Sequence, residues 1–269
     1  MMGKERIETM ITRAISDRLV GAEGRIGISY IDLNDEAELF FGNSKIFTGS
    51  GAVMIMALIE CFRQLENGTI NDDDKYCIKH AELGHSEDQS FGVLRFLHEG
   101  AELTLSDLYN LVGIISDNMA FNKLVDILGM DNIRNTFKNL GYENMQLNRK
   151  LDDEDAMSGG LENYISVPEL AAIFYRLYRG QLVSASASEK IISLLKFHQR
   201  NNMIPYIFQE DIMVAHLTGT DAELIIDAGL VFTEKPFILV MAVQDMDIRK
   251  AENLMRDITQ ICYRECKRP

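Results

Sequence analysis

Long hydrophobic runs are absent from this sequence of 269 residues. No apolar stretch approaches the roughly 20 residues that a transmembrane helix needs, so we expect no membrane partner. Residues Met1 to Glu8 become charged almost at once and lack the apolar core of a secretory leader. Together these features predict a cytoplasmic protein.

Positive charge is also in short supply. The chain has 27 Lys and Arg residues against 41 Asp and Glu residues, which gives a formal net charge of -14. A polyanion is repelled by phosphate backbones, so we expect no nucleic-acid partner. Because the acidic residues are spread along the chain, they indicate a well-solvated surface.

Cysteine is scarce, and its spacing does not predict a metal site. Cys262 and Cys266 share one face of a predicted helix, but no two further ligands with matching spacing accompany them. His80 and His85 lack a third histidine or a placed carboxylate, so we expect them at the surface. We therefore expect reduced thiols, no metal and no cofactor.

The apolar residues that are present follow helical and strand periods in a definite order. Apolar content is 46% and charged content 25%, as in an ordinary globular domain. Helices are predicted over 7–19, 47–65, 104–115, 120–128, 131–140, 166–180, 188–198 and 248–266. Strands are predicted over 25–33, 38–43, 212–219, 223–232 and 236–243.

Strands at both ends of the chain, with helices between them, predict an α+β fold. We expect one domain whose antiparallel sheet is built from both termini and carries flanking helices. Residues 1–66 and 182–269 would form this sheet part, and residues 67–181 an all-helical part. A cleft is expected where the two parts meet, with room for a small-molecule ligand. No sequence feature specifies an oligomeric state.

Several short motifs occur in a fixed order along the chain. They are Phe91-Gly92-Val93-Leu94, Ser116-Asp117-Asn118, Asn163-Tyr164-Ile165-Ser166, Ile204-Pro205, His216-Leu217-Thr218-Gly219-Thr220 and Asp227-Ala228-Gly229. With these motifs the chain resembles the class A β-lactamases, within the serine β-lactamase and penicillin-binding-protein superfamily. The resemblance covers nearly the whole chain and implies a β-lactamase/transpeptidase-like fold and β-lactam hydrolysis through a serine acyl-enzyme.

The family's chemistry uses three motifs, S-x-x-K, S-D-N and K-T-G. The resemblance implies that Ser116 relays protons and that Asn118 contacts the substrate. It also implies that the strand containing Leu217, Thr218, Gly219 and Thr220 binds the substrate. Leu217 stands at the lysine of K-T-G, which removes the cation that would attract a substrate carboxylate.

The nucleophile motif is altered as well. Counting back from Ala57-Leu58-Ile59-Glu60 places the serine at Thr48 and the lysine at Gly51, whereas a shift of two residues places them at Ser50 and Val53. Neither alignment supplies a lysine, and a hydroxyl without a neighbouring base is a poor nucleophile. Thr48 and Ser50 remain the nucleophile candidates, although capping of the helix N-terminus is the favoured interpretation of both.

The long polar connection over residues 146–163 corresponds to the loop that carries the family's deacylating glutamate. Asp152, Asp153 and Glu154 are the candidates for that carboxylate. A solvated acidic loop is an equally good interpretation of the same residues.

Three hypotheses follow from these motifs. In the first, the chain is a class A β-lactamase-like protein whose catalysis is impaired or lost and whose cleft binds a ligand. In the second, it is an active hydrolase of an ester, amide or β-lactam that uses Thr48 or Ser50 as the nucleophile. In the third, it is a cytosolic scaffold or dimer in which the cleft has no role.

Overall fold

The computed structural model describes residues 2–79, 91–208 and 212–266, and in these ranges helices surround a five-stranded sheet. His80 and His85, which the sequence predicted at the surface, lie outside the described residues. No helix in the described ranges combines the length and the apolar character needed to cross a lipid bilayer.

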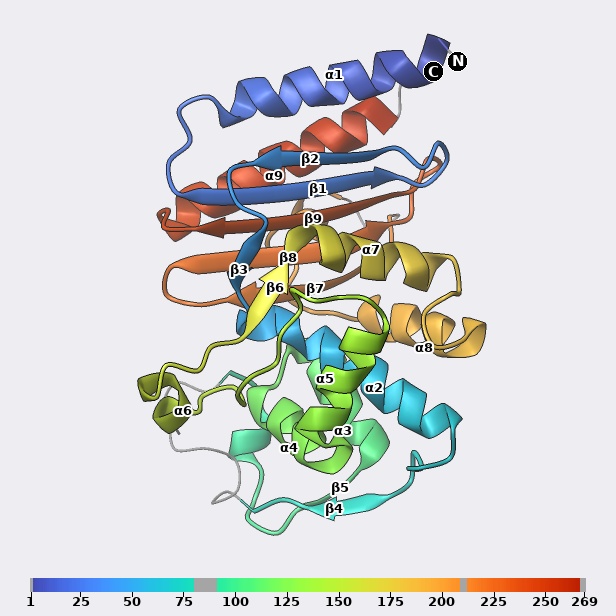
Figure 1. The fold of residues 1–269 in the computed structure, drawn as a ribbon, viewed down its shortest axis with the longest axis vertical. Helices are drawn as coiled ribbons and strands as arrows, with labels where there is room; N and C mark the ends of the chain where they lie inside the picture. Colours follow the sequence, from blue (N-terminus) through green and yellow to red (C-terminus); the bar gives the residue numbers. More distant parts are fainter. Residues whose placement is uncertain (1, 80–90, 209–211, 267–269) are drawn as a thin grey trace.

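The sheet is antiparallel and draws its strands from both ends of the chain, as predicted (Figure 1). Its strands are β1 (Arg25–Asp32), β2 (Glu38–Gly42), β7 (Val214–Thr220), β8 (Leu224–Val231) and β9 (Phe237–Gln244). They lie in the order β2-β1-β9-β8-β7. Gly27 in β1 pairs with Ala242 in β9, so the N-terminal hairpin joins the C-terminal strands directly.

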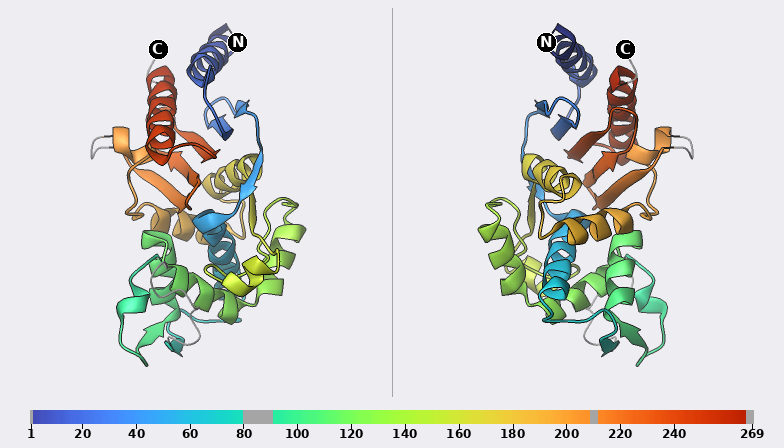
Figure 2. Two further views of the ribbon diagram at one scale, coloured as in Figure 1. Left: turned by 90° about the vertical axis from the view of Figure 1, so that its left-hand side faces the viewer. Right: turned by 90° about the vertical axis from the view of Figure 1, so that its right-hand side faces the viewer.

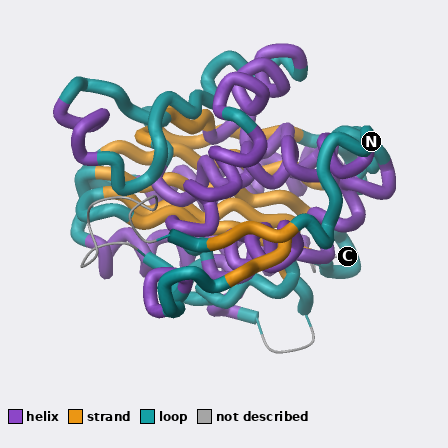
Figure 3. Tube along the Cα trace, turned by 90° about the horizontal axis from the view of Figure 1, so that it is seen from below, coloured by secondary structure: helices purple, strands orange, loops and turns teal. Residues whose placement is uncertain are grey.

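Long helices cover both faces of this sheet: α1 (Met2–Leu19), α9 (Ile248–Cys266) and α7 (Val167–Tyr178). Side chains alternate along β9, so Phe237 and Leu239 join the core under α1 and α9, which lie side by side in Figure 2. Ile238 and Val240 point the other way, into the core that α7 shares. The view from below in Figure 3 shows helices on both sides of the strands.

Five of the other helices gather below the sheet in Figure 1: α2 (Met54–Glu66), α3 (Leu105–Ile115), α4 (Asn118–Leu128), α5 (Met130–Asn139) and α8 (Ala185–Leu195). Helix α2 is central, because it contacts α3, α4, α5 and α8. Every residue from Met54 to Phe62 is buried, which suits a helix that is apolar almost all round.

Glu60 is the charged exception in this buried helix. Its side chain is fully buried and accepts hydrogen bonds from Arg63 at 2.7 Å, Gln64 at 2.7 Å and Thr136 at 2.6 Å. Gln64 also donates to the carbonyl of Leu128, at the end of α4. The network therefore fixes α2 against α4 and α5.

Short elements connect these helices and strands. They are β3 (Ile46–Thr48) with β6 (Tyr164–Ser166), β4 (Lys75–Cys77) with β5 (Glu102–Thr104), and the 3-10 turns η1 (Ser50–Val53), η3 (Leu94–Phe96) and η4 (Ile204–Ile207). Thr104 and Asp107 form a capping box at the start of α3, at the position where the sequence predicted a helix to begin. The predicted division at residues 67 and 182 stays a prediction; α7 lies before residue 182 and packs on the sheet.

Candidate functional site

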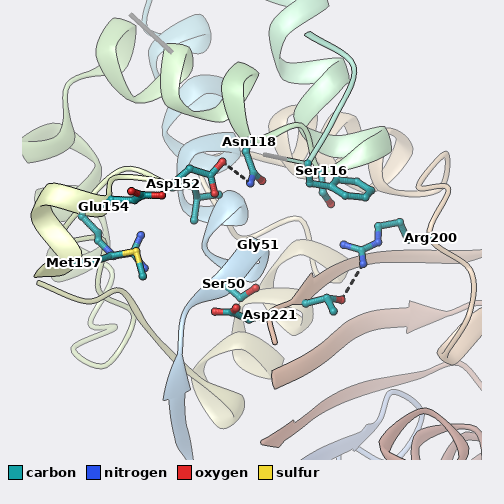
Figure 4. Close-up of a pocket in the computed structure, with 13 residues that line it drawn as sticks. Ser50, Gly51, Ser116, Asn118, Asp152, Glu154, Met157, Arg200 and Asp221 are labelled. Carbon is teal, nitrogen blue, oxygen red and sulfur yellow. Dashed lines mark hydrogen bonds between the residues drawn. The ribbon is translucent and has the colours of Figure 1, made fainter. Parts of the chain in front are cut away.

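A cavity of about 390 Å³ opens where the start of α2, the start of α4 and the end of β7 meet (Figure 4). Part of its wall comes from the loop before and around the short helix α6 (Glu154–Ser158). The lining residues are Ser50, Gly51, Phe91, Ser116, Asn118, Arg149, Leu151, Asp152, Glu154, Met157, Arg200, Thr220 and Asp221.

The start of α2 reaches the cavity through η1. Gly49 donates its backbone N–H to the carbonyl of Asn163 at 2.7 Å, which holds the chain just before Ser50. A Cβ atom built on Gly219 would lie only 2.9 Å from the backbone nitrogen of Ala52 and 3.2 Å from that of Gly51. Only glycine therefore lets strand β7 approach the helix start this closely.

The two nucleophile candidates lie in different places. Ser50 lines the cavity and has a φ of 32°, which is rare for a residue with a side chain. Thr48 is the last residue of β3, where it pairs with Tyr164, and it is not among the lining residues. Gly51, which one of the two sequence counts placed at the family's lysine position, follows Ser50 directly and also lines the cavity.

No base follows either cavity residue at the spacing of S-x-x-K. Val53 stands three residues after Ser50 and Met54 three residues after Gly51, and both are buried. Among the described residues that line the cavity there is no lysine and no histidine. The catalytic roles proposed for Thr48 and Ser50 therefore stay predictions, without a neighbouring lysine to support them.

The S-D-N triplet joins α3 to α4 at the cavity wall. Ser116 ends α3 in the left-handed conformation with a φ of 57°. Asp117 caps α4 through the backbone N–H of Ala120, and it also accepts hydrogen bonds from the N–H groups of Val93 and Leu94. With Asp117 held by these bonds, the neighbouring residues Ser116 and Asn118 both line the cavity.

The predicted carboxylates of the loop are divided by the structure. Asp152 lines the cavity, and its Oδ2 accepts a hydrogen bond of 2.9 Å from Nδ2 of Asn118. Glu154 also lines the cavity, whereas Asp153 caps α6 through the N–H of Ala156. The deacylating role stays a prediction for all three.

The strand β7 presents its end, rather than its middle, to the cavity. Leu217 and Thr218 are buried and do not line the cavity, whereas Thr220 does. The Thr218 hydroxyl lies 3.1 Å from Nε2 of His198, and Nδ1 of His198 lies 2.9 Å from the carbonyl of Gly113. Since the carbonyl can only accept, Nδ1 carries the proton and Nε2 accepts from Thr218.

Burial and the neighbouring His216 lower the pKa of His198 from 6.5 to about 4. His216 itself is 1% exposed and forms hydrogen bonds with Asp227 at 2.9 Å and with Asn201 at 3.0 Å. His216 is therefore a buried side chain whose two ring nitrogens both make hydrogen bonds.

Arg200 is the main cavity residue that the sequence did not reveal. Its guanidinium lies 4.5 Å from the centre of the Phe91 ring and donates a hydrogen bond of 2.9 Å to the Thr220 hydroxyl. Burial lowers its pKa. Residue 200 lies outside every motif of the resemblance, so only the folded chain brings this cation to the cavity.

Arg149 is the second cation of the lining, and it is already paired. Its side chain is 9% exposed and makes an ion pair of 2.7 Å with Glu162.

Across residues 2–79, 91–208 and 212–266, no group of three or more His, Cys, Asp or Glu side chains is placed to hold a metal ion.

Comparisons with known proteins agree on one family. The family model described as "Beta-lactamase enzyme family" matches residues 9–266. A β-lactamase of Citrobacter koseri is 23% identical over 175 residues, which are 64% of this chain and 58% of that relative's length.

Two solved structures show the shared fold over nearly the full chain. A β-lactamase from Sphaerobacter thermophilus DSM 20745 has a TM-score of 0.84 at 23% identity, covering 96% of this chain and 97% of that chain. A protein named PBP-A has a TM-score of 0.83 at 19% identity, covering 95% of both chains. They confirm the predicted α+β, β-lactamase-like fold.

Proposed function

Because the chain belongs to the beta-lactamase enzyme family, we propose that it is a class A-like member whose cleft binds a ligand reversibly and forms no acyl-enzyme. This makes it a pseudoenzyme on a hydrolase fold. A fold alone does not carry function, so the proposal depends on the residues in the cavity.

One observation carries the proposal: the helix start in the cavity presents Ser50 and Gly51 without a base. The residues one turn later, Val53 and Met54, are buried and apolar. Losing one general base typically costs about two to four orders of magnitude in rate. Because catalytic groups act as a unit, the absence of this base removes most of the acylation rate.

The polar groups that remain suit binding. Asn118 and Thr220 line the cavity and carry hydrogen-bonding side chains, and Arg200 supplies a cation beside them. The hydrogen bond from Arg200 to Thr220 holds this cation near the strand where Leu217 replaces the family's lysine. An anionic group of the ligand is expected to bind at Arg200.

The test is the turnover of a chromogenic β-lactam by the folded protein. We expect no hydrolysis above the rate of the buffer. Turnover that disappears in Ser50→Ala or Thr48→Ala would overturn the proposal, because it would make that hydroxyl a working nucleophile. A ligand-dependent rise in melting temperature separates a binding cleft from the scaffold hypothesis, which predicts none.

An active hydrolase is the second candidate, and the backbone of Ser50 favours it. Strained residues occur often at active sites, and Ser50 has a φ of 32° inside the cavity. The lining carboxylates Asp152, Glu154 and Asp221 would then have to assist the hydroxyl. A fluorophosphonate adduct on wild-type protein that is lost in Ser50→Ala, but kept in Thr48→Ala, would support this candidate.

The cytoplasmic location also remains a proposal. It would be tested by fractionating the source cells and probing the fractions with an antibody against the purified protein. Detection mainly in an extracytoplasmic fraction would contradict it.

A further inference from the structure

Within the described ranges, two side chains of opposite charge line the cavity without an ion-pair partner. They are Arg200 and Asp152, and both are partly buried. None of the ion pairs within the described ranges involves either residue. Partly buried charges normally have a partner, because removing them from water is costly. Each therefore has an unused capacity to bind an opposite charge.

The Arg200 guanidinium is held in one place. Its central carbon lies over the Phe91 ring, 4.5 Å from the ring centre, and one Nη atom donates to Thr220. A guanidinium has five N–H donors, so several remain for a ligand. This geometry suits a planar carboxylate, which can accept two parallel hydrogen bonds from arginine.

The Asp152 carboxylate is held equally firmly. The Asn122 side chain makes two hydrogen bonds with the backbone of Leu151: its Nδ2 donates to the carbonyl at 2.8 Å, and its Oδ1 accepts from the N–H at 2.9 Å. Asp152 follows with a φ of 58°, and Nδ2 of Asn118 donates to its Oδ2. Only Oδ2 is used in that bond, so Oδ1 can accept from an ammonium group.

The other charges of the lining do not take these roles. Glu154 and Asp221 are exposed, so water already solvates them. Arg149 is paired with Glu162. Among the described lining residues, Arg200 and Asp152 therefore remain as the two partly buried charges outside any ion pair.

Figure 4 shows these two side chains on opposite sides of the cavity, with Ser116 and Asn118 between them along one wall. We propose that the ligand is a zwitterion whose carboxylate binds Arg200 and whose ammonium group binds Asp152. This inference rests on the noncovalent binding proposed above. Asn118 and Ser116 would face an amide or another polar group in the middle of the ligand.

The size of the cavity narrows the ligand class. At about 390 Å³ it lies near the lower end of the range for small-molecule sites. An amino carboxylate or a dipeptide with both ends free fits this description, because its two charges lie at opposite ends of a short chain.

The experiment compares three probes of nearly equal size by isothermal titration calorimetry near neutral pH. Glycylglycine carries both charges, N-acetylglycylglycine lacks the ammonium, and glycylglycinamide lacks the carboxylate. We expect glycylglycine to bind at least about tenfold more tightly than either capped probe, since each charged contact contributes to discrimination.

Two variants assign each preference to its residue. Asp152→Asn keeps an oxygen for Asn118 and tolerates the left-handed backbone, so the fold is preserved. In this variant N-acetylglycylglycine should bind within about twofold of glycylglycine, and in Arg200→Gln the same should hold for glycylglycinamide. The control Glu154→Gln removes an exposed carboxylate of the lining and should keep the tenfold preference.

The inference is overturned if a capped probe binds wild-type protein as tightly as glycylglycine. It is overturned equally if Glu154→Gln loses the preference as Asp152→Asn does, or if glycylglycine does not bind at tens of millimolar. Turnover of a β-lactam would instead refute the noncovalent function and leave the charge preference standing, so the two failures are distinguishable.

Discussion

Acid should destabilise this protein through His198, because the fold holds its imidazole neutral. The side chain is 3% exposed, and both ring nitrogens are engaged, with Gly113 and with Thr218. Its ring meets that of His216 edge-on at 4.7 Å. Burial first, and then His216, lower the pKa of His198 from 6.5 to about 4.

The sign and size of the effect follow from these two pKa values. The unfolded chain takes up a proton near pH 6.5, whereas the folded chain does so only near pH 4. Stability from this group is therefore complete above pH 6.5 and is lost as the pH falls toward 4. The full difference corresponds to about 3 kcal/mol of unfolding free energy, of which about 2 kcal/mol is lost by about pH 5.

The assay is urea unfolding of wild type and His198→Gln at about pH 7.5 and at about pH 5. Glutamine keeps a hydrogen-bonding amide but does not titrate. The neighbouring charged and titratable side chains His216, Asp227 and Arg200 are present in both proteins, so the difference between the two proteins reports on position 198. The stability advantage of wild type should shrink by about 2 kcal/mol between the two pH values. An advantage that is equal at both pH values would show that the fold does not hold the imidazole of His198 neutral.

Two further predictions concern stability, measured by urea unfolding near neutral pH. Gly219→Ala should lower the unfolding free energy by about 2 kcal/mol, because the new methyl group meets the backbone of η1. In the control Gly159→Ala, the new Cβ comes no closer than 3.4 Å to its neighbours, so the unfolding free energy should stay within about 0.5 kcal/mol of wild type. Equal losses in the two variants would contradict the close approach of β7 to η1. Glu60→Ala should cost about 3 kcal/mol, because Gln64 and Thr136 lose a buried acceptor, and the exposed control Glu189→Ala should stay within about 0.5 kcal/mol. A Glu60 loss no greater than that of the control would show that the buried network contributes little.

Much of the fold could be predicted because its signals are local. Strand β8 (Leu224–Val231) is buried at every position, and its apolar run lies between turns that the sequence marks clearly. The capping box at Thr104 likewise depends on only four consecutive residues, from Thr104 to Asp107. Such patterns depend on neighbours in the chain, so no knowledge of the tertiary structure was needed.

Which residue before α2 reaches the cavity depends on contacts with distant parts of the chain, and this limited the prediction of the site. The helix start is fixed by the pairing of Phe47 with Ile165 in another part of the chain. A 3-10 turn then precedes α2, so counting back along a regular helix left the choice between Thr48 and Ser50 open, and only Ser50 lines the cavity. Pairing between distant segments cannot be read from the spacing of residues within one of them.

The position of Arg200 at the cavity also could not be predicted, because it depends on contacts with distant residues. It follows α8 in a segment where His198 binds Gly113 and Gln199 binds Ile114, and these contacts bring the cation to the cavity. Each of them joins residues more than 80 positions apart. A lone arginine between helix and strand carries no such information in the sequence.

The central claim is that the cleft has lost acyl transfer. The most direct measurement is the intact mass of the folded protein after prolonged incubation with excess penicillin. We expect an unchanged mass, because no base lies one turn beyond Ser50 or Gly51. A mass increase equal to one penicillin, present in wild type and absent in Ser50→Ala, would contradict it.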